Sequence, residues 1–249
     1  MGWKCSLVII ENKENFNDDK AILNAIGKTN YVYDGETTMV DCIYPNDQSI
    51  NIGYYNGNIV ISEDYKITAL TLDDSQKLHL SKEEKALVEL FPYSEILRVA
   101  CHSVTNFHGY SLIKNGTKTR MKIVDSESAK IEFGEPLKEE IEIYKNSFVE
   151  DGQTLWPDEA NPGEPYTEDQ LMEDFAFGIA KRRLGVQIDD DEGEELMEKI
   201  KFKKYIKSNP PLNQPENSTS TNKTEYKWLQ HLIKLIIILI IWQLIKRAL

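Results

Sequence analysis

The chain has 249 residues, of which 41% are hydrophobic and 10% aromatic, and this composition supports a packed core and excludes disorder along its whole length. The formal net charge is −12, and because residues 223–249 carry five basic side chains against one acid, residues 1–222 hold about −16. A part so acidic repels the phosphates of nucleic acid, so we expect no nucleic-acid partner.

The cysteines and the N-terminal residues indicate a reducing compartment. Cys5, Cys42 and Cys101 are widely spaced and odd in number, which is typical of reduced thiols packed in a core. The apolar run from Cys5 to Ile10 is shorter than the core of a secretory signal, and Glu11 follows it directly. We therefore expect the N-terminal domain to be cytoplasmic, and the Lys-, Asn- and Ile-rich composition is typical of bacterial proteins.

The first third of the chain predicts one helix and several strands. Residues 3–10 form the first strand, and residues 17–27 form a short helix that Gly27 closes. Residues 31–45 are expected to be extended, with a turn at Asp34-Gly35. Residues 50–62 are expected to form a hairpin at Asn56-Gly57, because this dipeptide suits a two-residue turn with positive φ angles.

Two further helices have recognisable caps. Residues 81–91 begin with a capping box, Ser81 and Glu84, and stop at Pro92. Strands follow over residues 96–124, with a hairpin at Asn115-Gly116. Residues 167–185 form the second capped helix, which ends at a left-handed glycine. The acidic run 189–195 lacks the order of a calcium loop and is expected to be a solvated turn.

These elements predict an α+β domain over residues 1–207, built from one or more antiparallel sheets with a few packed helices. Residues 194–206 are expected to be a helix, with a strand over "IKFKKYIK" as the alternative. The order helix, strand, Asn-Gly hairpin occurs twice, so an internal duplication stays open. Residues 208–225 predict a flexible linker, since they are polar and contain several prolines.

A cysteine, two histidines and a serine lie close together in residues 101–108. A two-residue turn at Asn115-Gly116 would set His108 on one face with Tyr110, Leu112, Met121 and Ile123, which indicates a core histidine. Adjacent residues of a strand point to opposite faces, so neighbouring members of the cluster cannot form a nucleophile and base pair.

A dyad across two strands, formed by Cys101 or Ser103 with His108, remains an alternative for catalysis. A zinc site of Cys101, His102 and His108 is disfavoured because no fourth ligand is evident. No phosphate loop, dinucleotide-binding glycine motif, serine elbow or zinc-protease motif occurs, so no cofactor and no metal are expected. Four acids could pair as catalytic carboxylates but are interpreted as solvated loop residues, namely Glu159, Glu164, Glu168 and Asp169.

The segment "ACHSVTNFHGYSLIKNG", followed by Arg120 and by "FGEPL" at residues 133–137, resembles a bacterial domain family of unknown function. Proteins of that family are similar in running a histidine-serine-valine strand into an aromatic-rich hairpin, then a "GEPL"-like turn, then a helix near "FAFGIAKRRLG". The resemblance covers residues 1–207 or their second half. It implies the same fold and carries no activity or catalytic residue to this chain.

Residues 226–249 predict a membrane-anchoring helix. The 21 residues from Leu229 to Leu249 would make a helix of about 31 Å, close to the roughly 30 Å hydrocarbon core of a bilayer. Lys234 lies near one end, where its long side chain can reach the interface. Spanning is the prediction, with an interfacial helix or a helix packed on protein as alternatives. The unbroken apolar block is Leu235, Ile236, Ile237, Ile238, Leu239, Ile240, Ile241 and Trp242.

Two function hypotheses follow. The first is a non-enzymatic binding module: a single-pass anchor holds an acidic α+β domain at the cytoplasmic membrane face, where it binds a protein or small ligand. The second is a membrane-attached hydrolase or transferase that uses Cys101 or Ser103 with His108. An enzyme needs a pocket where these side chains converge, whereas a binding module presents a broad apolar or charged face.

Overall fold

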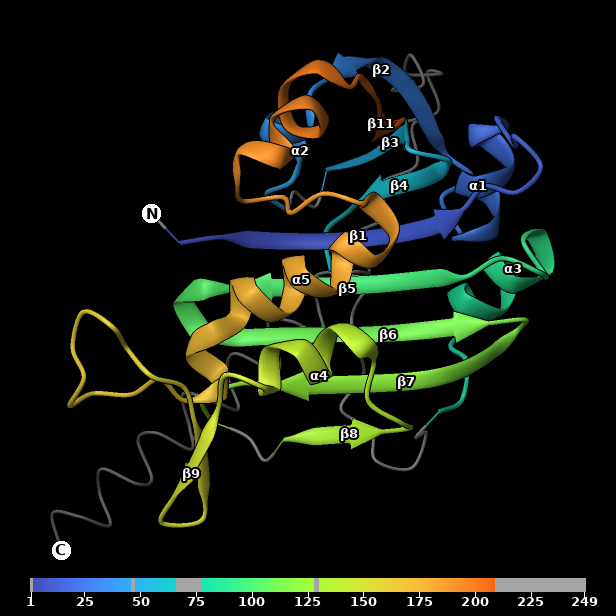
Figure 1. Cartoon of the computed structure of the whole chain (residues 1–249). Coiled ribbons are helices and arrows are strands. Elements are labelled where there is room, and N and C mark those ends of the chain that lie inside the picture. The colour runs from blue at the N-terminus through green and yellow to red at the C-terminus, as the bar shows by residue number, and fades with distance from the viewer. Residues whose placement is uncertain (1, 46–47, 66–77, 128–129, 209–249) are drawn as a thin grey trace, which may run out of the picture. The chain divides into compact units, whose positions relative to one another are not determined.

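In the computed structural model, nine strands form one antiparallel sheet in the order β2-β11-β3-β4-β1-β5-β6-β7-β8 (Figure 1). The structure describes residues 2–45, 48–65, 78–127 and 130–208, and residues 1–208 form one folded unit. The sheet strands are β1 (Lys4–Glu11), β2 (Tyr31–Thr37), β3 (Ser49–Tyr55), β4 (Asn58–Ser62), β5 (Ile96–His102), β6 (Phe107–Lys114), β7 (Thr117–Val124), β8 (Ile131–Phe133) and β11 (Phe202–Lys207).

Helices cover both faces of this sheet. The helices are α1 (Asp19–Ala25), α2 (Met39–Cys42), α3 (Lys82–Leu90), α4 (Lys138–Tyr144) and α5 (Met172–Leu184). Shorter turns lie at Ser103–Thr105, Glu168–Leu171, Asp191–Gly193 and Glu195–Lys199. A separate two-stranded hairpin, β9 (Phe148–Glu150) and β10 (Gln153–Leu155), projects from the domain at the lower left of Figure 1.

The side chains of successive strand residues point to opposite faces of the sheet and form two hydrophobic cores, one on each face. On the α5 face, Leu7 and Val99 pack with Phe175 of α5 and are fully buried. On the α3 face, Val8 and other strand residues pack with Ile22 of α1 and with α3. Figure 1 shows α4 and α5 lying across β5, β6 and β7. The α+β class with a large antiparallel sheet and several helices is therefore confirmed.

The predicted hairpins and caps are confirmed. Both Asn-Gly pairs form the turns of hairpins, and all four of their residues have positive φ angles. Ser81 and Glu84 make the reciprocal hydrogen bonds of a capping box at the start of α3. Gly185 takes the left-handed conformation at the end of α5.

The predicted register of the β6–β7 hairpin is wrong by one residue. Thr119 forms a bulge, so Leu112 pairs with Arg120 and Tyr110 pairs with Lys122, whereas Ile113 still pairs with Lys118. In a regular ladder, the three cations of β7, Lys118, Arg120 and Lys122, would all lie on one face of the sheet. Because of the bulge, Lys118 pairs with Glu84 on the α3 face, whereas Arg120 and Lys122 pair with acids on the α5 face.

His108 consequently shares its face with Tyr110, Leu112, Arg120 and Lys122, and the expected neighbours Met121 and Ile123 point the other way. The bulge lies against Gly134, which has a φ of +82° and approaches the bulge closely. A Cβ at Gly134 would lie 2.0 Å from the Thr119 carbonyl oxygen. The glycine of the "FGEPL" segment is thus required by the bulge.

Two other predictions are corrected. The expected turn at Asp34-Gly35 is a bulge inside β2, because Tyr33 and Gly35 pair with consecutive residues of β11. The expected helix over residues 194–206 is a single turn at Glu195–Lys199 followed by strand β11. This strand pairs with both β2 and β3. Its backbone N–H and C=O groups are therefore hydrogen-bonded on both sides, which stabilises the strand over the helix.

No helix formed by the described residues is both long and apolar enough to cross a membrane. The predicted linker over residues 208–225 begins at the last described residue, and the membrane helix predicted over residues 226–249 lies outside the described part of the chain.

Candidate functional site

The structure separates the members of the cysteine, histidine and serine cluster. Cys101 is fully buried on the α5 face, and its Sγ atom lies 3.4 Å from that of Cys5 on the neighbouring strand β1. His102 is partly exposed, and its Nδ1 lies 3.4 Å from the hydroxyl of Thr105. Ser103 begins the turn after β5, and its N–H donates to the Trp3 carbonyl at 2.9 Å.

The register of β5 and β6 brings one pair of this cluster together. Cys101 and His108 stand directly opposite each other, and both face α5. The His108 ring stacks on Phe175 with a centroid distance of 4.8 Å and an interplanar angle of 4°. Both side chains are 0% exposed, so a substrate could reach this pair only after α5 moves. Ser103 is not opposite His108 in this register.

A buried polar cluster surrounds His108. Lys122 of β7 forms an ion pair with Glu168 and donates to the Tyr144 hydroxyl at 2.7 Å. That hydroxyl donates in turn to Glu168 Oε2 at 2.7 Å. The Lys122 ammonium also lies 4.7 Å from the centroids of the Tyr144 and Phe175 rings, within the range of a cation–π interaction. The cluster therefore joins β7 to α4 and to the start of α5.

Burial controls the protonation of this cluster. It lowers the pKa of His108 to about 3, assisted by the nearby Lys122, so the imidazole is neutral at physiological pH. Burial also lowers the pKa of Lys122, although Glu168 opposes this effect. Burial next to Glu168 raises the pKa of the Tyr144 hydroxyl, which keeps its proton and its role as a donor. These groups are held in fixed states and support the packing of α4 and α5.

The interpretation of Glu168 as a solvated loop residue is corrected by this geometry. Its side chain is only 11% exposed, because it forms an ion pair with a fully buried lysine. Its companion Asp169 accepts a hydrogen bond from Asn106 at 3.0 Å. The sequence signal was the capping box at Thr167, which places the next acid in the first turn of a helix that packs on the sheet.

A groove of about 630 Å³ lies beside this cluster and opens to solvent. Its walls come from the end of α4, from the loop over residues 156–166 and from α5. The volume is in the range of ligand-binding sites. The side chains that define its chemistry are Ile143, Trp156, Glu159, Tyr166, Leu171 and Asp174.

The loop of the groove is anchored at its two ends. Trp156 and Tyr166 exchange two backbone hydrogen bonds of 2.9 and 2.8 Å. The Trp156 indole donates to the Ile143 carbonyl at 3.0 Å and packs against Tyr144 with a centroid distance of 5.2 Å. Because Tyr144 belongs to the buried polar cluster, that cluster supports the aromatic wall of the groove from behind.

Gly178 forms part of the wall contributed by α5. A glycine inside a helix costs about 1 kcal/mol relative to alanine. Packing does not require it, because a Cβ at this position would meet only the terminal methyl of Ile143, at an ordinary contact distance of 3.4 Å. Because Gly178 and Ile143 both line the groove, a side chain larger than alanine at position 178 is expected to narrow it.

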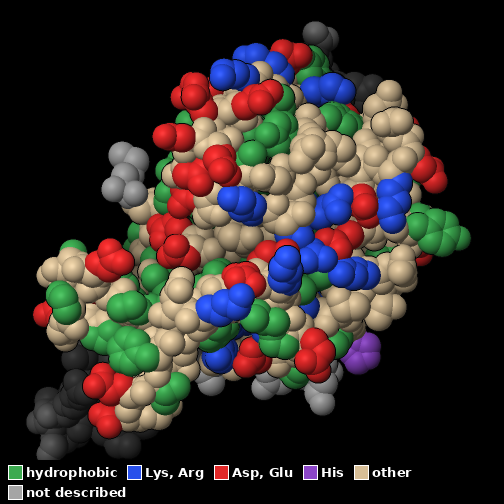
Figure 2. All heavy atoms as spheres, in the orientation of Figure 1, with side chains coloured by type: hydrophobic (Ala, Val, Ile, Leu, Met, Phe, Trp, Pro, Cys, Tyr) green, Lys and Arg blue, Asp and Glu red, His purple; other side chains and the backbone are tan. Residues whose placement is uncertain are grey.

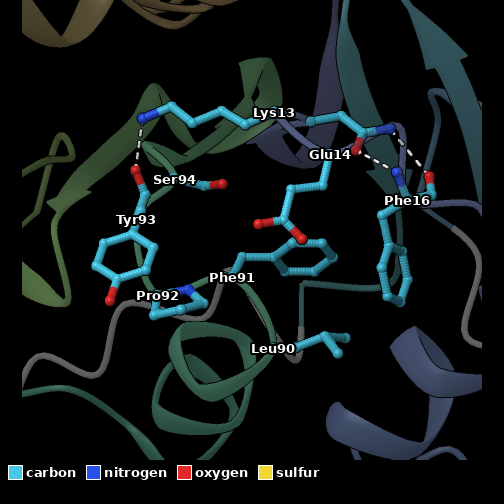
Figure 3. Close-up of a pocket in the computed structure, with 9 residues that line it drawn as sticks. Lys13, Glu14, Phe16, Leu90, Phe91, Pro92, Tyr93 and Ser94 are labelled. Carbon is cyan, nitrogen blue, oxygen red and sulfur yellow. Dashed lines mark hydrogen bonds between the residues drawn. The ribbon is translucent and has the colours of Figure 1, made fainter.

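Two other hollows are less suited to a ligand. One of about 50 Å³ lies between Phe16 and Phe91, where Figure 3 shows Glu14 pointing inward and Lys13 donating to the Tyr93 carbonyl. It can hold only a few water molecules. Another, of about 300 Å³, is lined largely by asparagines, and the amides of Asn12 and Asn58 are already bonded to backbone groups.

Among the described residues, no cluster of three or more histidine, cysteine, aspartate or glutamate side chains could hold a metal ion. No protein-family model, no curated protein and no solved structure matches this chain. A proposal of function therefore rests on the geometry of the described residues and on the amino-acid sequence.

Proposed function

We propose that this protein is a non-enzymatic binding module whose groove between α4, α5 and the 156–166 loop receives a ligand, and whose C-terminal segment anchors it to a membrane. The observation that carries the binding role is the groove of about 630 Å³ between α4, α5 and the 156–166 loop. The resemblance to a bacterial family of unknown function contributes no activity to this proposal.

The membrane part of the proposal rests on the sequence of the tail. The apolar block over residues 235–242 and the 21-residue length from Leu229 match the thickness of a bilayer. A linker of 18 residues would let the domain move within on the order of 20 to 25 Å of its anchor. A tethered module gains effective concentration for any ligand at the same membrane without making new contacts.

Blocking the groove tests the binding role. The intact protein, used as bait in detergent-solubilised membranes, should capture a partner that Gly178→Leu loses and Gly178→Ala retains. Leucine fills the groove, whereas alanine adds one methyl group in ordinary contact with Ile143. Equal capture by all three proteins, with both variants folded, would exclude the groove as the binding site.

Extraction tests the anchor. The intact chain should sediment with membranes and resist both high salt and alkaline carbonate, because salt screens charges but leaves apolar burial in place. Replacing Ile237 and Ile240 with lysine adds two charges at about 3 kcal/mol each and should move the protein to the soluble fraction. Release of the wild type by carbonate would instead favour an interfacial helix.

The alternative enzymatic role requires Cys101 to become accessible. Cys101 and His108 are suitably opposed, but both are fully buried. The hydrogen bond with the Cys101 thiol, together with burial, raises the pKa of the neighbouring Cys5, so Cys5 stays a protonated thiol. Iodoacetamide labelling of the folded protein tests this role. If Cys101 is labelled within minutes, and this labelling is lost in His108→Phe, the result would favour the hydrolase or transferase over a binding module.

A further inference from the structure

The acids of the groove have no basic partner among the described residues, in contrast to the acids that form buried ion pairs. Glu95 is paired with Arg182 and Lys114, and several other carboxylates form comparable ion pairs. Within the described part of the chain, neither Glu159 nor Asp174 forms an ion pair. None of the described residues that line the groove is lysine or arginine. The groove therefore presents negative charge that the domain itself does not neutralise.

The surroundings of Asp174 favour a bound cation, because two other carboxylates lie near it. Partial burial and the nearby carboxylates Asp189 and Glu173 raise the pKa of Asp174, which means that its charged form is disfavoured in the free protein. A bound cation would reverse this effect, since an opposite charge within a few ångströms favours the ionised carboxylate. A basic group placed here would thus be bound more tightly than a neutral group of the same shape.

The remaining walls of the groove are aromatic and aliphatic. Tyr166, which is 37% exposed, contributes a ring that can attract a cation, and the largely buried Trp156 contributes apolar surface with Ile143 and Leu171. Lysine and arginine side chains combine a long apolar stem with a charged end, and this combination matches a groove with apolar walls and acids at its rim. An acidic ligand would be repelled, and a purely apolar one would leave the carboxylates unpaired.

The apolar surface continues outside the groove onto the β9–β10 hairpin. This hairpin runs directly from one groove residue, Asn146, to another, Trp156. Phe148 and Val149 on its first strand are 41% and 72% exposed. In Figure 2, hydrophobic and acidic side chains lie together at this projecting end, whereas the basic side chains visible on the same face lie over the middle and the top of the domain.

We infer that the groove binds a lysine or arginine side chain of a partner polypeptide, with apolar residues of that polypeptide flanking it on the hairpin. The inference rests on the proposed binding function and specifies the chemistry of the ligand. A polypeptide is favoured over a free amine because the apolar surface extends from the groove onto a hairpin with two exposed large side chains. Such a partner is basic, so its charge complements the net charge of about −15 on residues 1–208.

Selection from a random heptapeptide display library on immobilised residues 1–208 tests the inference. This segment contains all the described strands and both cores, so it is expected to fold without the tail. We expect enrichment of peptides with a lysine or arginine next to an aromatic or aliphatic residue. Binding of a selected peptide should weaken roughly tenfold in the double variant Glu159→Gln, Asp174→Asn, and should weaken as salt rises.

A control variant with the same net charge is available elsewhere on the domain. Glu89→Gln with Glu198→Gln removes two exposed acids that do not line the groove, and it should bind the selected peptide like the wild type. If both double variants weaken binding equally, the effect is one of overall charge and the inference is overturned. Binding can be followed by Trp156 fluorescence in a Trp3→Phe background, which leaves a single tryptophan in residues 1–208.

The outcomes separate this inference from the function on which it rests. Enrichment of neutral or acidic peptides that Gly178→Leu no longer binds would overturn the basic ligand but keep the binding groove. If the same peptides are enriched on Gly178→Leu, or if no peptide is enriched on any protein, both the basic ligand and the binding groove are overturned. A further readout is the pKa of Asp174 by carbonyl NMR, which should fall when a selected basic peptide binds and should not change with its norleucine analogue.

Discussion

The buried cluster of Glu84, Arg98 and Lys118 gives a quantitative test of the fold. Glu84 of α3 is fully buried and forms ion pairs with both cations, which are themselves only 2% and 5% exposed. Glu84→Gln keeps the shape of the side chain and an oxygen that can accept the capping hydrogen bond from Ser81. The substitution therefore removes the charge and leaves two buried cations without an anion.

Removing one partner of a buried ion pair costs about 3 to 5 kcal/mol, a large part of the 5 to 15 kcal/mol that stabilises a typical domain. In urea unfolding of residues 1–208, with a slope of about 3 kcal/mol per molar, the midpoint should fall by about 1 to 2 M. The matched control is Glu142→Gln, at a surface pair with Lys145, and it should leave the midpoint unchanged.

The stabilisation that Glu84 provides should also depend on pH. Burial acts to raise the pKa of Glu84, but Arg98 and Lys118 outweigh it, so the pKa of the folded state lies below its ordinary value. The stabilisation is therefore complete above the unfolded pKa and is lost as pH falls through the folded pKa. The difference between wild type and Glu84→Gln should shrink in that acidic range. Equal midpoints for the two proteins at pH 7 would refute the argument that the cluster is desolvated.

Three further perturbations follow from the structure. Gly134→Ala should lower the free energy of unfolding by at least ~2 kcal/mol, and by more than Gly152→Ala, which has a similar positive φ but open space around it. Wild type should lose stability relative to His108→Phe as pH falls from 6.5 towards 3, because the unfolded histidine binds a proton that the folded one does not; denaturation at several pH values checks this. Truncation after Ser208 should give a folded domain by circular dichroism, whereas truncation after Tyr205 should be less stable, since it removes the last two rungs of β11 with β2.

Local sequence signals predicted those parts of the fold that neighbouring residues determine. The Asn-Gly hairpins need positive φ angles that few residues adopt, and the α3 capping box needs only Ser81 and Glu84. The sequence favours a helix over the residues of strand β11, with a strand as the alternative, because the alternation is weak and the pairing partners lie about 170 (β2) and about 150 (β3) residues earlier in the chain. Its structure is decided by tertiary pairing.

The β6–β7 bulge and the groove could not be read from local patterns. The bulge is favoured because Lys118 has its anion on one face of the sheet and Lys122 has its anion on the other. Neither acid is near these lysines in sequence. The groove likewise combines residues from α4, a loop and α5, and its Trp156 and Asp174 were indistinguishable from an ordinary core aromatic and an ordinary surface acid.

The charges that organise the fold also distinguish the acids that are available to a ligand. β7 carries three buried cations, and each meets a carboxylate from a different element: Glu84 from α3, Glu140 from α4 and Glu168 from the segment before α5. Because a different helix or turn supplies the anion for each of the three β7 cations, these pairs fix which element covers which part of the sheet. Acids engaged in this way are buried beneath the elements that carry them and are not accessible to a ligand. Glu159 and Asp174 lie in the groove beside the same elements, have aromatic neighbours and lack a cation among the described residues. A basic ligand would therefore supply at the surface the cation that β7 supplies to the buried acids.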